Sequence, residues 1–124
     1  MKKLESILVS FFRNIYPFIT KLNVGKDSDD DDDVEYTLTL FCDGKRFQSF
    51  LPISPNFIDG TGKLKKDLLD RPFNHFLSLT DDNQSNIGRA KTLETNLKRD
   101  FYLARRMAGS DFKSGPVKLR IVLQ

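Results

Sequence analysis

The stretch from 86 to 108 constrains the fold of this chain most, because its small and apolar residues recur at the spacing of one helix face. On a helical projection they occupy a stripe roughly 80° wide. Ser85 precedes the stretch as an N-cap, and Gly109 follows it as a left-handed terminator. The sequence therefore predicts a long helix over 86–108, whose buried stripe consists of Ala90, Leu93, Leu97, Phe101, Ala104 and Ala108.

A second helical pattern lies at the N-terminus. Pro17 interrupts it, because the proline ring would clash with the carbonyl of Arg13. We expect the helix to kink or stop near Tyr16, and a further helical turn after Pro17 is compatible with the pattern. Packing on the core is the preferred interpretation, and a seam between two copies or a helix on a membrane surface are the alternatives. The residues that recur at helical intervals are Leu4, Leu8, Phe11, Ile15, Phe18 and Leu22.

Residues 34 to 53 carry the pattern of a β-hairpin in which Asp43 and Gly44 form a two-residue type I′ turn. That turn would place Leu40 opposite Phe47 and would gather nearly every apolar residue on one face. Such a division is what a half-buried sheet requires. We therefore expect two antiparallel strands here.

The C-terminal stretch 117–123 alternates apolar and polar residues over most of its length, as a strand does. We expect it to join the hairpin as a third strand. With 124 residues the chain is about one domain long. The expected fold is therefore a single α+β domain, in which a small antiparallel sheet (hairpin 34–53 plus strand 117–123) packs against the N-terminal helix and the long helix 86–108.

The segment between the hairpin and the long helix is harder to interpret. Lys63 to Asp70 could form a short helix that ends before Pro72. Gly60 and the pair Gly62-Lys63 resemble a phosphate-binding loop superficially. However, Thr61 alone separates them, fewer residues than the P-loop pattern requires, so no phosphate cradle is expected.

Charge is segregated along the chain. The total of 20 basic and 17 acidic residues gives only +3, yet residues 27–33 contain six aspartates and no basic residue. We expect a flexible, solvated acidic loop at about 25–33. A calcium-binding EF-hand is rejected, because Asp32 stands where the pattern requires glycine and Leu38 where it requires glutamate. An internal polyanion that competes with phosphates for basic residues is a further hypothesis for this run.

No catalytic constellation is evident in the sequence. Cys42 is the single cysteine and His75 the single histidine, and a cysteine on a strand usually acts as a small hydrophobic residue. An internal disulfide and a cysteine-rich zinc site are both excluded. We therefore predict a non-enzymatic protein without metal or cofactor. The lone cysteine and the lack of a long apolar run favour an intracellular, cytoplasmic protein without a membrane span.

The outer face of the long helix is the remaining candidate site. Measured from Leu97, one row of cations lies at roughly 80° to 120° and a second near 180° to 200°, with a tyrosine between them. Residues 86–124 carry nine basic and three acidic residues, so this region is electropositive. A solvated helix surface is the plain alternative. The candidate contact residues are Lys91, Lys98, Arg99, Tyr102, Arg105 and Arg106, and Lys113, Lys118 and Arg120 could extend the surface.

These features predict a nucleic-acid-binding accessory protein whose cations neutralise phosphates while Tyr102 stacks on a base. Binding of this kind should be weakly sequence-specific and strongly salt-dependent. The alternative is a protein-protein interaction module, such as a small inhibitor or assembly factor. It would bind an acidic partner, or form a homodimer through the N-terminal helix, using exposed apolar or aromatic surface that includes Phe11, Phe12, Phe41 and Phe50.

Overall fold

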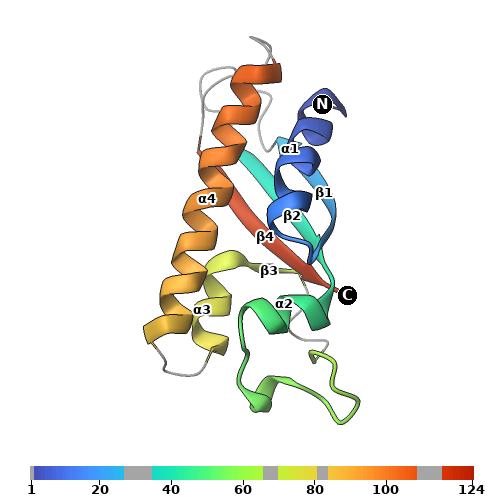
Figure 1. Cartoon of the computed structure of the whole chain (residues 1–124), viewed down its shortest axis with the longest axis vertical. Helices are drawn as coiled ribbons and strands as arrows, with labels where there is room; N and C mark the ends of the chain where they lie inside the picture. The colour runs from blue at the N-terminus through green and yellow to red at the C-terminus, as the bar shows by residue number, and fades with distance from the viewer. Residues whose placement is uncertain (1, 27–34, 66–69, 81–83, 109–115) are drawn as a thin grey trace.

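The fold is α+β, as the sequence predicted, and consists of helices on one face of a mixed four-stranded sheet (Figure 1). The computed structural model describes residues 2–26, 35–65, 70–80, 84–108 and 116–124. The main elements in chain order are α1 (Lys2–Ile15), β1 (Ile19–Lys26), β2 (Tyr36–Cys42), α2 (Gly44–Phe50), β3 (Arg71–Pro72), α3 (Phe76–Leu79), α4 (Gln84–Ala108) and β4 (Val117–Leu123).

The strand order is β1-β2-β4-β3. β1 is antiparallel to β2, and the short β3 is antiparallel to β4. β4 lies parallel to β2, with Tyr36 opposite Val117 and Cys42 opposite Leu123. The predicted C-terminal strand is therefore confirmed, but the prediction of an antiparallel sheet is wrong. The long α4 connection returns the chain to the starting end of β2, so β4 runs in the same direction.

The hairpin predicted for residues 34–53 does not form. β2 ends at Cys42, and Asp43 is the N-cap of α2, because its carboxylate accepts hydrogen bonds from the backbone N–H groups of Lys45 (3.0 Å) and Arg46 (3.4 Å). An aspartate followed by glycine is common in tight turns and equally suited to starting a helix. Phe47 consequently packs in the core from a helix instead of pairing with Leu40.

Gly44 has a different role from the one the turn pattern suggested. A Cβ atom built at this position would lie 3.0 Å from the backbone oxygen of Gln124, which accepts a hydrogen bond from the Gly44 N–H at 2.9 Å. Glycine is therefore favoured here because the end of β4 approaches the backbone closely, and no positive φ is involved.

Helix α1 ends at Ile15, before Pro17, in agreement with the expected stop. The chain does not resume the helix but turns at Pro17 and Phe18 and then enters β1. Phe18 is buried in this turn, and Leu22 is buried within the strand. Leu8 and Phe12 on α1 are fully buried, and α1 contacts β1 and α4. The preferred interpretation, a helix packed on the core, is thus confirmed.

Helix α4 is confirmed over the predicted range and begins at Gln84. Ser85 therefore lies inside the first turn and is not the N-cap, whereas Gly109 lies outside the described residues. The predicted stripe is correct for every residue whose side chain is described. Those residues are at most 1% exposed and are Ala90, Leu93, Leu97, Phe101 and Ala104.

The segment between α2 and α4 contains short elements and little regular structure. The expected helix at 63–70 does not start, because Leu64 forms an isolated antiparallel bridge with Ile58 and Lys63 to Lys65 are not helical. The rest of that range, 66–69, lies outside the described residues. Phe76 anchors this segment in the core, with its ring 5.6 Å from the ring of Phe47.

The two faces of the sheet differ sharply. The side chains that point toward α1 and α4, such as Leu38 and Leu40 on β2 and Ile121 on β4, are fully buried. The alternate residues, such as Lys118 and Arg120, are exposed. In the part of the chain that the structure describes, the helices cover one face only, and α4 presents its outer side to solvent (Figure 1).

Candidate nucleic-acid interface on helix α4

The outer side of α4 carries three of the predicted cations in exposed positions. Lys91, Arg99 and Arg106 all point away from the sheet, as the helical projection indicated. They are spread along the helix from its first third to its last turn. The structure therefore keeps an electropositive strip on this side, although it contains fewer available charges than the sequence suggested.

Two of the predicted cations form ion pairs with carboxylates of the same helix. Lys98 Nζ lies 3.5 Å from Glu94 Oε1, and Arg99 Nε lies 3.4 Å from Asp100 Oδ1. Both side chains of the Lys98 pair are partly exposed, and ion pairs in contact with solvent contribute little, typically about 0–1 kcal/mol. The Arg99 side chain is 66% exposed while that of Asp100 is only 10% exposed. Arg99 thus remains accessible to an external anion despite its partner.

Arg105 is not on the outer surface, which corrects its predicted place in the row of cations. Only 8% of the residue is exposed. Its guanidinium carbon lies 5.6 Å from the ring centre of Tyr36, 5.5 Å from that of Phe101 and 5.0 Å from that of Tyr102. A guanidinium among aromatic faces is stabilised by cation–π attraction. Arg105 therefore holds neighbouring rings in place instead of contacting a distant phosphate.

Arg105 is buried because the surface of α4 that the rest of the fold covers is wider than the predicted apolar stripe. Arg105 lies near the border of the buried stripe, and β2 brings Tyr36 over that border. Tyr36 is far from Arg105 in the sequence, so periodicity within α4 could not reveal the contact. The long aliphatic stem of arginine allows burial at such a border.

Tyr102 is positioned as predicted, with 42% of its surface exposed. Its ring contacts the guanidinium of Arg105 and the ring of Phe101, whose centre is 5.8 Å from its own. A tyrosine fixed on one side and exposed on the other presents a preformed surface for stacking.

Two exposed apolar residues next to this tyrosine were missed in the sequence. Leu103 is 46% exposed and Met107 is 56% exposed, and their spacing places them side by side on one face of α4. On the helical projection, Arg99 and Arg106 both lie between Tyr102 and this apolar pair. Both residues lie outside the predicted stripe, at about 240° and 280° from Leu97, so the sequence pattern already places them off the buried face.

The proposed extensions of the surface do not join α4. Lys118 and Arg120 lie on the open face of the sheet, and they are paired with Glu35 Oε1 (2.7 Å) and Asp70 Oδ2 (3.1 Å), respectively. Lys113 and the aspartate run 27–33 fall outside the described residues. The candidate interface is thus the outer side of α4 alone, defined here as Lys91, Lys98, Arg99, Tyr102, Leu103, Arg106 and Met107.

The residues considered for catalysis are placed apart from this surface. Cys42 is fully buried in the core, with its thiol directed to the carbonyl oxygen of Leu40 at 3.8 Å, and burial raises its pKa from 9.0 to about 12. His75 packs edge-on against the Phe76 ring at 6.2 Å. The thiol is thus a core group, which confirms the expected hydrophobic role of Cys42.

The pKa of Cys42 makes its reactivity a test of the fold. At pH 8 the native thiol should react with Ellman's reagent roughly a thousandfold more slowly than the urea-unfolded chain, because a shift of three pKa units lowers the thiolate fraction by that factor. The neutral thiol is favoured in the folded state, so its contribution to stability is complete below pH 9.0 and is lost as the pH rises toward 12. Equal rates in buffer and urea would contradict the buried placement.

The loop that resembled a phosphate-binding segment is organised around Asp59. Its carboxylate accepts hydrogen bonds from the Thr61 hydroxyl (2.6 Å) and from the backbone N–H groups of Thr61 (2.8 Å) and Lys63 (3.1 Å). The Thr61 hydroxyl contributes most to holding the pKa of Asp59 below its ordinary value. These N–H groups are therefore used inside the loop and form no cradle for a phosphate.

Within the described residues, no group of three or more His, Cys, Asp or Glu side chains is placed to hold a metal ion. None of the helices in that part of the chain combines the length and the apolar character needed to cross a bilayer. Comparisons with protein families, with curated proteins and with solved structures found no match.

Proposed function

We propose that this protein is a nucleic-acid-binding module that uses the outer side of α4. The observation that supports this proposal best is the combination of exposed Arg99 and Arg106 with Tyr102, whose ring is fixed by Arg105. Phosphates attract the cations, and an unpaired base stacks on the tyrosine. Single-stranded nucleic acid is the ligand, because stacking requires an unpaired base and nothing in the surface reads a duplex groove.

The proposal differs from the sequence-based one in its residues. Arg99, Arg106 and Lys91 neutralise phosphates, and Lys98 contributes less because Glu94 shares its charge. Arg105 acts as a positioning residue for Tyr102. The smaller number of cations lowers the expected salt dependence, because each phosphate contact adds a fixed increment to it.

The test is binding of fluorescein-labelled single-stranded DNA and RNA, followed by anisotropy at several salt concentrations. Arg99→Gln/Arg106→Gln should weaken binding on the order of tenfold and reduce the slope of log K against log salt by about 1.4, at roughly 0.7 per lost contact. The matched control, Lys45→Gln/Lys63→Gln, removes the same charge from exposed positions outside α4 and should cause a smaller change. Equal effects of the two double variants would rule out a localised interface.

A second candidate function rests on the exposed pair Leu103 and Met107. Methionine, tyrosine and arginine are enriched at protein contact surfaces, and Leu103 adds exposed apolar area beside them, so docking of a protein partner on the same face of α4 is the alternative. Leu103→Ser/Met107→Ser should then abolish capture of a partner that survives nuclease treatment of the lysate, while leaving nucleic-acid binding intact. Capture that is lost after nuclease treatment favours the first function.

A further inference from the structure

One edge of the sheet is only partly covered by its neighbouring strand. β3 pairs with β4 through Arg71 opposite Ile121 and Pro72 opposite Arg120, and the chain then turns into a 3-10 helix at Phe73. Among the described residues, no strand lies beside Val117 and Lys118 on this side. The first part of β4 is therefore a sheet edge.

The backbone of Val117 points toward that edge. Gln124 donates its N–H to the carbonyl oxygen of Cys42 and accepts from the N–H of Gly44, so both of its backbone groups face the β2 side. Successive residues of a strand direct these groups to opposite sides. Because the backbone groups alternate along β4, those of Lys118 face β2 and those of Val117 face the opposite side, toward the edge. An extended backbone placed along this edge would thus find a donor and an acceptor at Val117.

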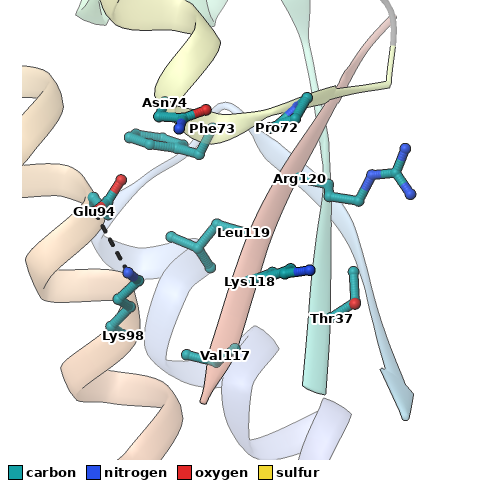
Figure 2. A pocket seen from close by; sticks show the side chains of 10 residues that line it. All are labelled: Thr37, Pro72, Phe73, Asn74, Glu94, Lys98, Val117, Lys118, Leu119 and Arg120. Carbon is teal, nitrogen blue, oxygen red and sulfur yellow. Dashed lines mark hydrogen bonds and ion pairs between the residues drawn. The ribbon is translucent and has the colours of Figure 1, made fainter. Parts of the chain in front are cut away.

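A cavity of about 550 Å³ lies at the same place, between β4 and α4 (Figure 2). Val117, Leu119 and Phe73 form its apolar side facing α4. Lys118 and Arg120 project to the opposite side of the strand in Figure 2. An added strand would therefore meet apolar side chains on one side and basic side chains on the other, which matches the alternation of a strand.

We propose that this edge binds an acidic peptide of another protein in extended conformation, by addition of a strand to β4. The peptide would place apolar side chains in the cavity and acidic side chains near Lys118 and Arg120. Three cations line the cavity, Lys98, Lys118 and Arg120, and each lies beside one carboxylate, that of Glu94, Glu35 and Asp70, respectively. Lys118 remains 69% exposed and Arg120 44% exposed beside their partners.

Charge also distinguishes this occupant from a second copy of the chain. Antiparallel pairing of two β4 edges would bring Lys118 and Arg120 of one copy next to the same residues of the other. Like charges directly opposite each other destabilise a pair of strands. This site goes beyond the proposed function of α4, and Lys98 is the one residue of the α4 interface that also lines the cavity.

The test uses the full chain and a fluorescein-labelled peptide in which valine and glutamate alternate. We expect saturable binding measured by anisotropy, with shifts of the Val117 and Leu119 amide signals in ¹H–¹⁵N spectra. The same peptide with N-methylated backbone amides, which cannot pair with a strand edge, should lose binding. A peptide alternating valine and lysine should bind at least about tenfold more weakly.

Two variants separate the backbone and charge contributions. Val117→Pro removes an edge donor at the first residue of the strand, where proline is tolerated, and should weaken binding on the order of tenfold or more. Lys118→Glu should weaken binding similarly, and it keeps the strand if Val117→Pro fails to fold. Lys21→Glu, on the open face of the sheet in β1, is the matched control and should bind as the unmodified chain does.

Three results would overturn the proposal. They are equal binding of the N-methylated and unmodified peptides, amide shifts confined to the outer side of α4, and concentration-dependent dimerisation that Val117→Pro abolishes. The last result would assign the edge to a second copy of the chain. Because Lys118→Glu leaves α4 unaltered, loss of peptide binding in this variant is distinguishable from failure of the nucleic-acid proposal.

Discussion

Replacing Phe101 with alanine should lower the free energy of unfolding by about 3–5 kcal/mol, the usual cost of deleting a buried phenylalanine ring. Phe101 is fully buried, and its ring lies 5.7 Å from that of Tyr36. It also supports the guanidinium of Arg105. The truncation would leave a cavity at the junction of α4 and β2. Since domains are typically stable by only about 5–15 kcal/mol, the loss would be a large part of the total.

The matched control is Tyr102→Ala, one residue along the same helix. Tyr102 is 42% exposed, so its truncation should cost no more than about 1 kcal/mol. Urea denaturation followed by far-ultraviolet circular dichroism measures both variants, because the helical signal does not depend on the ring that is removed. Losses of equal size would contradict the orientation of α4, and with it the placement of the proposed interface.

Thr39→Pro should prevent folding or destabilise the protein by about 3 kcal/mol or more. β2 lies between β1 and β4, and Thr39 pairs with Asn23 on one side and with Arg120 on the other. A proline in a central strand removes a ladder donor and is found essentially only on edges. The side chain of Thr39 is half-buried, so the effect comes from the backbone.

Thr39→Ala provides the control for loss of the side chain and should cost well under half of the proline effect. Circular dichroism and thermal unfolding of both variants give the comparison. In the predicted hairpin, the C-terminal strand could have paired with either of the two strands, so the sequence did not predict that β2 is a central strand. A stable, folded Thr39→Pro protein would therefore contradict the observed strand order directly.

The elements predicted correctly from the sequence are those whose pattern is long and local. Helix α4 shows its buried stripe over many turns, and β4 alternates apolar and polar residues over most of its length. Both patterns depend on one face packing against the core, whatever that core is made of. The long helix and the last strand were for this reason assigned correctly although the topology was not.

The errors occurred where a short motif has two meanings. Asp43 and Gly44 are suited to a turn and to a helix start, and in the structure Asp43 caps α2 while Gly44 contacts the distant Gln124. β1 was missed because Phe18 and Leu22 continue the helical spacing of α1 past Pro17. Burial of both residues satisfies either structure, so spacing alone could not separate them.

The candidate site was predicted in part, because some of its residues are placed by local helix geometry and others by contacts between distant segments. Exposure of Lys91, Arg99 and Arg106 follows from their angle on the helix, which is a local property. The burial of Arg105 depends on Tyr36, and the pairing of Lys118 depends on Glu35, which are contacts between distant segments. Positions at the border of a buried stripe are thus decided by tertiary structure, and the helical projection assigns them poorly.

The parallel neighbour of β2 is encoded near the other end of the chain, because Tyr36 pairs with Val117. During synthesis β2 is therefore made well before β4, and one of its sides has no strand to bind until that later segment has been made. Pairing between such distant segments slows folding and prolongs the exposure of an unpaired strand edge that is prone to aggregate. Newly made chains should consequently depend on dilution or on chaperones during this interval more than a helical bundle of equal length would.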